Sequence, residues 1–138
     1  MAQQEPAYPK VTDLDGTDPM TTDAVPHISR TDLLQGIQNK TVTVVDTLPV
    51  DMHVRQHLPG SLSIVGFPYE EATARTGEAA PKLLPDKSAK IALYCINVPC
   101  RNSEYVGRQL IRLGYKNVYK YAEGIQDWAR NGLPTEKG

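Results

Sequence analysis

Cysteine is scarce in this chain, since only Cys95 and Cys100 occur among its 138 residues. Two cysteines five positions apart do not make the disulfide framework of a small secreted domain, so a reducing, cytoplasmic compartment is expected. The stretch from Met1 to Pro6 also lacks the basic and apolar regions of a signal peptide. A periplasmic location would fit only a chain from which such a signal had been removed.

Other absences exclude further classes of protein. No apolar run approaches the roughly 18 residues that span a bilayer, so no membrane partner is expected. Lys and Arg number 15 against 16 Asp and Glu, without a basic stripe, so no nucleic-acid partner is expected. Glycine-rich and lysine-containing phosphate motifs are absent, and the three histidines show no ligand-like spacing. The sequence therefore predicts neither a cofactor nor a metal, and it leaves the oligomeric state open.

The length of the chain is that of one domain. Residues 1–26 are rich in Asp, Thr, Pro and Gln and contain few large apolar side chains. We expect an N-terminal extension here that is partly mobile, followed by a folded domain over residues 27–138.

Apolar periodicity within the domain alternates between strand and helix patterns. Short β-branched or alternating runs predict strands at residues 41–46, 61–65, 91–94 and 116–121. Helical apolar faces are expected after Ser29, after Pro49, over residues 106–113 and from about Ile125. Residues 66–88 contain several Gly and Pro, and predict only a turn or two of helix. This order predicts an α/β fold with a mostly parallel sheet flanked by helices.

Both cysteines lie in one stretch, where the apolar strand 91–94 ends at Cys95 and a helix begins after a tight loop. Amides at a helix N-terminus have no intrahelical partner and carry partial positive charge, which favours a thiolate. We therefore take Cys95 as a nucleophile within an anion-binding loop. The expected loop residues are Ile96, Asn97, Val98, Pro99, Cys100, Arg101 and Asn102.

The neighbours of this nucleophile leave alternatives open. Cys100 can be a resolving or sulfur-accepting thiol, an inert loop cysteine or a metal ligand. Arg101 can clamp an oxyanion or be a solvated cation at the helix start. Asn102 or Ser103 is expected to cap that helix. Asp46, which ends the strand 41–46, is expected to support the loop or a neighbouring turn by hydrogen bonds.

Several short motifs, taken in order, resemble the rhodanese-like domain family over residues 27–136. They are Val44-Val45-Asp46, His57-Leu58-Pro59-Gly60-Ser61, Tyr94-Cys95, Leu113-Gly114-Tyr115, Glu123-Gly124, Trp128 and Gly132-Leu133-Pro134.

The resemblance implies a three-layer rhodanese-like fold and a sulfurtransferase. Its catalytic cysteine, here Cys95, would take sulfane sulfur from thiosulfate or a persulfide donor. It would pass this sulfur to cyanide or a thiol. The implied partners are therefore a small sulfur-donor anion and a thiol acceptor.

The active loop departs from the family pattern. The family usually has four residues between Cys and an Arg-Ser pair, whereas Cys100 stands at that position here and Arg101 follows it. The spacing from Cys95 to Arg101 also fits the Cys-x5-Arg loop of phosphatases and arsenate reductases, which is a second hypothesis. A third is an interaction module that keeps the fold without catalysis.

Overall fold

Nine helices and strands make up the part of the chain that the structure, a computed structural model, describes, residues 25–138. The extension expected over residues 1–26 lies outside that part except for Val25 and Pro26, and its boundary stays a prediction. The elements in chain order are α1 (Arg30–Asn39), β1 (Thr43–Asp46), α2 (Val50–Arg55), β2 (Leu62–Ser63), α3 (Tyr69–Leu83), β3 (Lys90–Tyr94), α4 (Asn102–Arg112), β4 (Asn117–Tyr121) and α5 (Gly124–Arg130).

The four strands form one parallel sheet in the order β2-β1-β3-β4. The chain leaves β1 toward one edge and leaves β3 toward the other, so the direction of winding changes between these two central strands. Asp46, Tyr94 and Tyr121 lie side by side at the carboxyl ends of their strands. In open α/β sheets, ligands bind outside the carboxyl ends of the strands at such a switch point. The expected α/β architecture is confirmed.

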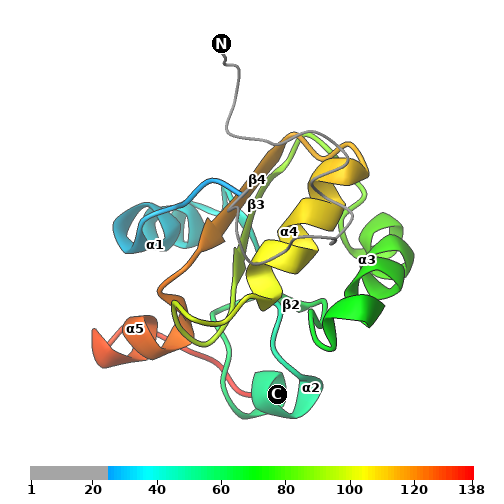
Figure 1. Ribbon diagram of the computed structural model, residues 1–138. Helices are drawn as coiled ribbons and strands as arrows, with labels where there is room; N and C mark the ends of the chain where they lie inside the picture. Colours follow the sequence, from blue (N-terminus) through cyan, green and yellow to red (C-terminus); the bar gives the residue numbers. More distant parts are fainter. Residues whose placement is uncertain (1–24) are drawn as a thin grey trace.

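Helices cover both faces of the sheet, with α3 and α4 on one side and α1 and α5 on the other (Figure 1). Two apolar clusters fill the spaces between these layers. Along β3, Ile91 and Leu93 belong to the cluster under α3 and α4, whereas Ala92 and Tyr94 belong to the other. Side chains alternate in this way because successive residues of a strand point to opposite faces. None of the helices described has the length and hydropathy that a bilayer crossing requires.

Two predicted elements differ in length from the observed ones. α3 runs for 15 residues and contains Gly77 and Pro81, where only a turn or two was expected. Pro81 has no N–H to donate to the Gly77 carbonyl, and α3 ends two residues after it. The strand expected at residues 61–65 is only Leu62–Ser63. It lies at the sheet edge and pairs on one side only.

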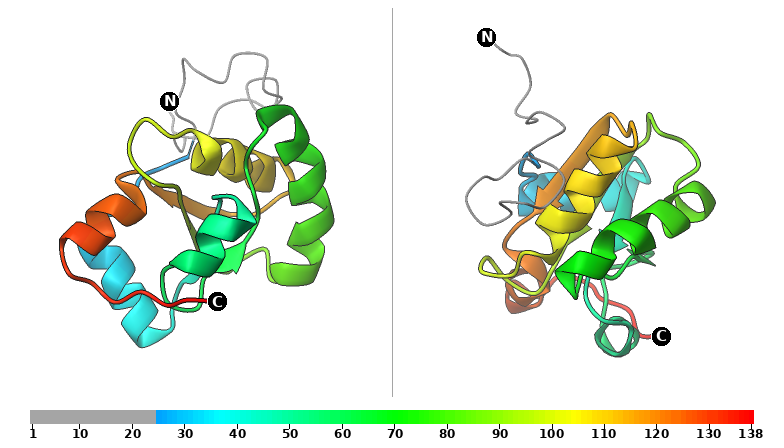
Figure 2. Two further views of the ribbon diagram at one scale, coloured as in Figure 1. Left: turned by 90° about the horizontal axis from the view of Figure 1, so that it is seen from below. Right: turned by 45° about the vertical axis from the view of Figure 1, so that its right-hand side comes forward.

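The C-terminal segment returns to the carboxyl edge of the sheet beside α2 (Figure 2). His57 and Glu136 exchange two backbone hydrogen bonds, at 2.9 and 2.8 Å. The Gly138 amide donates to the Val54 carbonyl at 2.7 Å. Lys137 is therefore held next to α2.

Glu104 links α4 to β4 through a buried ionic cluster. One of its carboxylate oxygens accepts from Arg108 Nε, and the other accepts from Lys120 Nζ, each at 2.7 Å. All three side chains are at least nine-tenths buried. Removing one member of such a cluster takes a charged partner from buried charges, which is strongly destabilising.

Replacing Glu104 with Gln should lower the free energy of unfolding by about 3–5 kcal/mol, because two buried cations lose their carboxylate. Urea denaturation measures this change. Glu78→Gln, on the exposed side of α3, is the matched control and should stay within about 0.5 kcal/mol of the parent. Equal stabilities of the two variants would contradict the account of the cluster.

Candidate active site

Cys95 follows the last residue of β3, at the point where the winding of the sheet changes direction. The preceding residue is fixed firmly: the Tyr94 carbonyl accepts from the Thr47 amide at 3.1 Å and from its hydroxyl at 2.8 Å. The Tyr94 hydroxyl donates to Asp46 Oδ2 at 2.9 Å and accepts from the Leu58 amide at 3.1 Å. The end of β3 is therefore held by both the backbone and the side chain of Tyr94.

Asp46 is fully buried and forms the hydrogen bonds of a structural support. Its Oδ1 accepts from the Leu48 amide at 2.8 Å, which is the neighbouring turn expected from the sequence. Its Oδ2 lies 2.8 Å from His53 Nδ1 as well as next to the Tyr94 hydroxyl. Burial, followed by the charge of Asp46, raises the pKa of Tyr94 above its usual range. Tyr94 therefore stays neutral, and its hydroxyl keeps its proton while it donates a hydrogen bond to Asp46.

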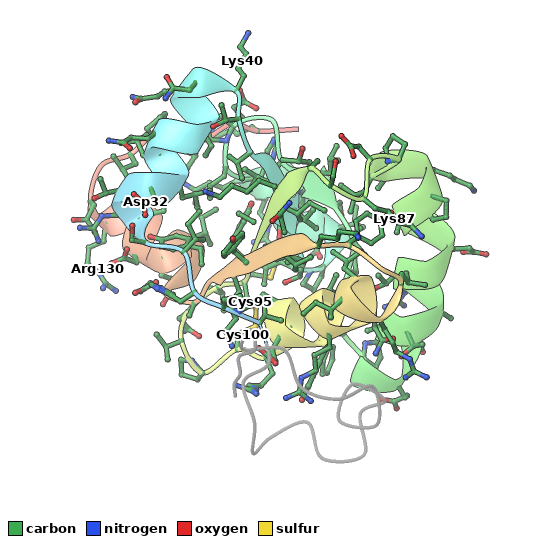
Figure 3. The ribbon with its side chains drawn as sticks, turned by 90° about the horizontal axis from the view of Figure 1, so that it is seen from above. Asp32, Lys40, Lys87, Cys95, Cys100 and Arg130 are labelled. Atoms are coloured by element: carbon green, nitrogen blue, oxygen red, sulfur yellow. A yellow bond between two sulfur atoms is a disulfide. The ribbon has the colours of Figure 1, made fainter. Side chains whose placement is uncertain are left out.

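The sulfur of Cys95 is bonded to that of Cys100, and their Cα atoms lie 6.2 Å apart (Figure 3). Cys95 is 1% exposed and belongs to the apolar cluster under α1 and α5, while Cys100 is half-buried. In this oxidised form Cys95 faces a second sulfur and not an anion. One bond between cysteines five positions apart is not a disulfide framework, so the expected compartment stays a prediction.

The start of α5 holds the first half of the active loop. The amides of Ile125 and Gln126 donate to the carbonyls of Cys95 and Ile96, each at 3.0 Å. Gly124 has φ +75°, and a Cβ there would lie 2.5 Å from the carbonyl carbon and oxygen of Ile96. Only glycine permits this close approach of the two backbones. The sequence motif contained this glycine, but its contact with the loop could not be foreseen.

The second half of the loop is a turn that leads into α4. The Cys100 amide donates to the Asn97 carbonyl at 3.1 Å. Pro99 has no N–H. Neither Pro99 nor Cys100 can therefore donate a backbone hydrogen bond to an anion in this conformation. That the other loop amides bind an anion in the reduced form stays a prediction.

The expectation that Asn102 or Ser103 caps α4 is wrong. The N-cap position is occupied by Arg101, which makes no side-chain cap, and Asn102 is already helical. The Asn102 side-chain amide instead donates to the Thr47 carbonyl at 3.0 Å. This tertiary hydrogen bond ties the start of α4 to the end of β1. Arg101 is half-buried, and Ser103 is buried within the first turn.

The expected loop residues separate onto two sides of the loop. Ile96 lines a cavity of about 460 Å³ together with Leu48, Met52, Arg55, Gln56, Ile125 and Lys137. Asn97, Val98 and Pro99 border a smaller cavity of about 230 Å³ beside α5. The larger cavity is lined by apolar side chains and by two cations, Arg55 from α2 and Lys137 from the C-terminal segment. The sequence alone gave no reason to expect these two residues to lie together.

Metal binding has no geometric support within residues 25–138, where no group of three or more His, Cys, Asp or Glu side chains converges. While they are bonded to each other, Cys95 and Cys100 are not available as ligands.

Comparison with known proteins gives one family. The sequence model of the family described as "Rhodanese-like domain" matches residues 29–131. No curated protein sequence matches the chain.

Solved structures of the same fold include the BH2092 protein from Bacillus halodurans, with 22% identity and a TM-score of 0.68. That match covers 81% of this chain and 77% of the other. A thiosulfate sulfurtransferase from Pseudomonas aeruginosa has 18% identity and a TM-score of 0.65, over 83% of this chain but 20% of the other. A "rhodanese with anions" from E. coli has 24% identity and a TM-score of 0.55, over 70% and 99%. These structural similarities show a common fold.

Replacing Gly124 with Ala should displace the active loop and lower the free energy of unfolding by about 2–4 kcal/mol. The added Cβ is strained in the left-handed backbone conformation of this residue, and it clashes with the backbone of Ile96. Gly132→Ala is the matched control. Gly132 has φ +70° with nothing within 4 Å of the added Cβ, so only about 1–2 kcal/mol should be lost. Urea denaturation of the pair measures the difference, and equal losses would show that the loop does not press on Gly124.

Proposed function

Because this chain belongs to the rhodanese-like domain family, we propose that it is a sulfurtransferase that carries sulfane sulfur as a persulfide on Cys95. The donor is thiosulfate or a persulfide, and the acceptor is a thiol or cyanide. The observation that carries this proposal is the position of Cys95 at the end of a central strand, at the switch point of a parallel sheet.

The proposed reaction begins with the reduced protein. The Cys95 thiolate attacks the sulfane sulfur of thiosulfate, the sulfur–sulfur bond of the donor breaks, and sulfite leaves with the bonding electron pair. The acceptor then attacks the outer sulfur of the persulfide, and the Cys95 thiolate is the leaving group. Neither step requires an outside oxidant or reductant. The disulfide must be opened before the first step, because a bonded sulfur is not a nucleophile.

The cavity beside Ile96 supports an anionic donor. Arg55 and Lys137 bring positive charge to its lining, whereas its base is apolar. Arg55 also pairs with Asp51 at 3.3 Å, but both groups are highly exposed, so the pair is weak. Cations at the mouth of a cavity raise the local concentration of a dianion such as thiosulfate.

The Cys-x5-Arg alternative has less support. A phosphate or arsenate needs several amides directed at its oxygens. Pro99 has none to offer, and that of Cys100 is engaged within the turn. An interaction module would need no reactive thiol at all, and the experiment below separates it from an enzyme.

Thiosulfate added to the dithiol-reduced Cys100→Ser protein should increase its intact mass by one sulfur atom, because Cys95 is then the only cysteine. Cys95→Ser, treated in the same way, is the control and should gain nothing. Intact-mass spectrometry measures both. If thiosulfate, mercaptopyruvate and a persulfide donor all leave the mass unchanged, the proposed function is wrong.

Replacing Arg55 and Lys137 together with Gln should raise the KM for thiosulfate about three- to tenfold at low ionic strength, with kcat within about twofold of the parent. The difference should shrink in about 0.5 M salt, because exposed charges are screened. Lys90→Gln removes an exposed cation at the opposite end of β3 and is the matched control. An unchanged KM in the double variant would show that this cavity does not bind the donor.

A further inference from the structure

Cys100 lies where it can act on the sulfur that Cys95 carries. We propose that the Cys100 thiolate attacks the Cys95 persulfide, releases hydrosulfide and leaves the Cys95–Cys100 disulfide observed in the structure. The inference rests on the proposed function, because it requires the persulfide to form. It makes the protein a dithiol-dependent producer of hydrosulfide.

The two sulfurs meet without a rearrangement of the surrounding elements. The Cα separation of 6.2 Å lies within the usual range for disulfides, about 4.4–6.8 Å. The α5 amides hold the Cys95 and Ile96 carbonyls at 3.0 Å, and the Cys100 amide closes the turn to Asn97 at 3.1 Å. These hydrogen bonds do not involve sulfur, so opening the disulfide removes none of their donors or acceptors. The proposed reaction requires that they keep Cys100 beside Cys95 in the reduced protein.

Burial decides which sulfur atom of the persulfide each nucleophile can reach. Cys95 is 1% exposed, so an external thiol reaches only the outer sulfur, and attack there would release the Cys95 thiolate. Cys100 borders the inner sulfur, which is the atom to which it is bonded in the structure. Attack at the inner sulfur expels the outer one as hydrosulfide.

Two features favour Cys100 over an external thiol. Its attack is intramolecular, and a held nucleophile acts at an effective concentration far above the millimolar range of a free thiol. Cys100 also lies immediately before the first turn of α4, where the partial positive charge of the helix stabilises a thiolate.

The steps balance in atoms and electrons. Thiosulfate, the Cys95 thiolate and one proton give the protonated persulfide and sulfite. The Cys100 thiolate then forms a bond to the Cys95 sulfur, the bond to the outer sulfur breaks, and hydrosulfide leaves with the electron pair. The two cysteines are oxidised, and the sulfane sulfur is reduced. A dithiol reductant, which supplies two electrons and two protons, opens the disulfide for the next cycle.

The test is a single turnover without oxygen. Reduced and desalted wild-type protein, Cys100→Ser and Cys95→Ser each receive excess thiosulfate with no external thiol or cyanide. Sulfite, hydrosulfide and intact mass are measured. Wild type should release one sulfite and one hydrosulfide per chain and end two hydrogens lighter than the reduced form. Cys100→Ser should release sulfite, gain one sulfur and release hydrosulfide about a hundredfold more slowly or not at all. Cys95→Ser should release neither.

A wild-type protein that keeps the added sulfur while Cys100 stays open to alkylation would overturn the inference and leave the proposed function intact. Equal hydrosulfide release from Cys100→Ser would do the same. Absence of sulfite from both wild type and Cys100→Ser would overturn the proposed function, and the inference with it. Cys100→Ala is the second variant, and thermal unfolding of both variants beside reduced wild type checks that the fold is retained.

Multiple turnovers distinguish the two routes further. Dithiothreitol should sustain hydrosulfide production by wild type, because it opens the Cys95–Cys100 disulfide after each turnover. Transfer to cyanide should persist in Cys100→Ser, because cyanide attacks the outer sulfur and needs only Cys95.

Discussion

The hydrogen bonds at the end of β3 are the constraint on which the candidate site depends. The Thr47 amide and hydroxyl both donate hydrogen bonds to the Tyr94 carbonyl, and the buried Asp46 carboxylate accepts a hydrogen bond from the Tyr94 hydroxyl. These contacts join the carboxyl ends of the two central strands, β1 and β3. Because Cys95 is the next residue, its position is set by groups that take no part in sulfur chemistry. The strand end can thus stay fixed while the loop beyond it changes its bonding.

The loop itself is held at two points. At one point the first amides of α5 bind its carbonyls, and at the other a turn leads into α4. Between these points lie two sulfurs that are close enough to bond. A nucleophile so enclosed gains protection from solvent oxidants, but it gives up open access for a large acceptor. In the proposed reaction, this geometry therefore favours release of the sulfur through Cys100.

Local signals in the sequence predicted most of the fold. The Ser29 hydroxyl accepts from the Asp32 amide at 3.1 Å and so caps the helix expected after Ser29. The site was predicted less well, because its contacts join residues far apart in the chain. The Asn102 side chain bonds to Thr47 rather than capping its own helix, a tertiary contact that overrides a local preference. The cations beside the loop come from α2 and the C-terminal segment, which no sequence pattern combines.

The central claim is that Cys95, although buried, is a reactive thiol held at a strand end and not an inert structural cysteine. The most direct test is the pH dependence of iodoacetamide alkylation of reduced Cys100→Ser, where Cys95 is the single thiol. The account predicts an apparent pKa below the usual value for cysteine, about 8.5, because the partial positive charge at the start of α4 favours the thiolate. A pKa at or above that value would show that the thiol of Cys95 is not activated and would contradict the account.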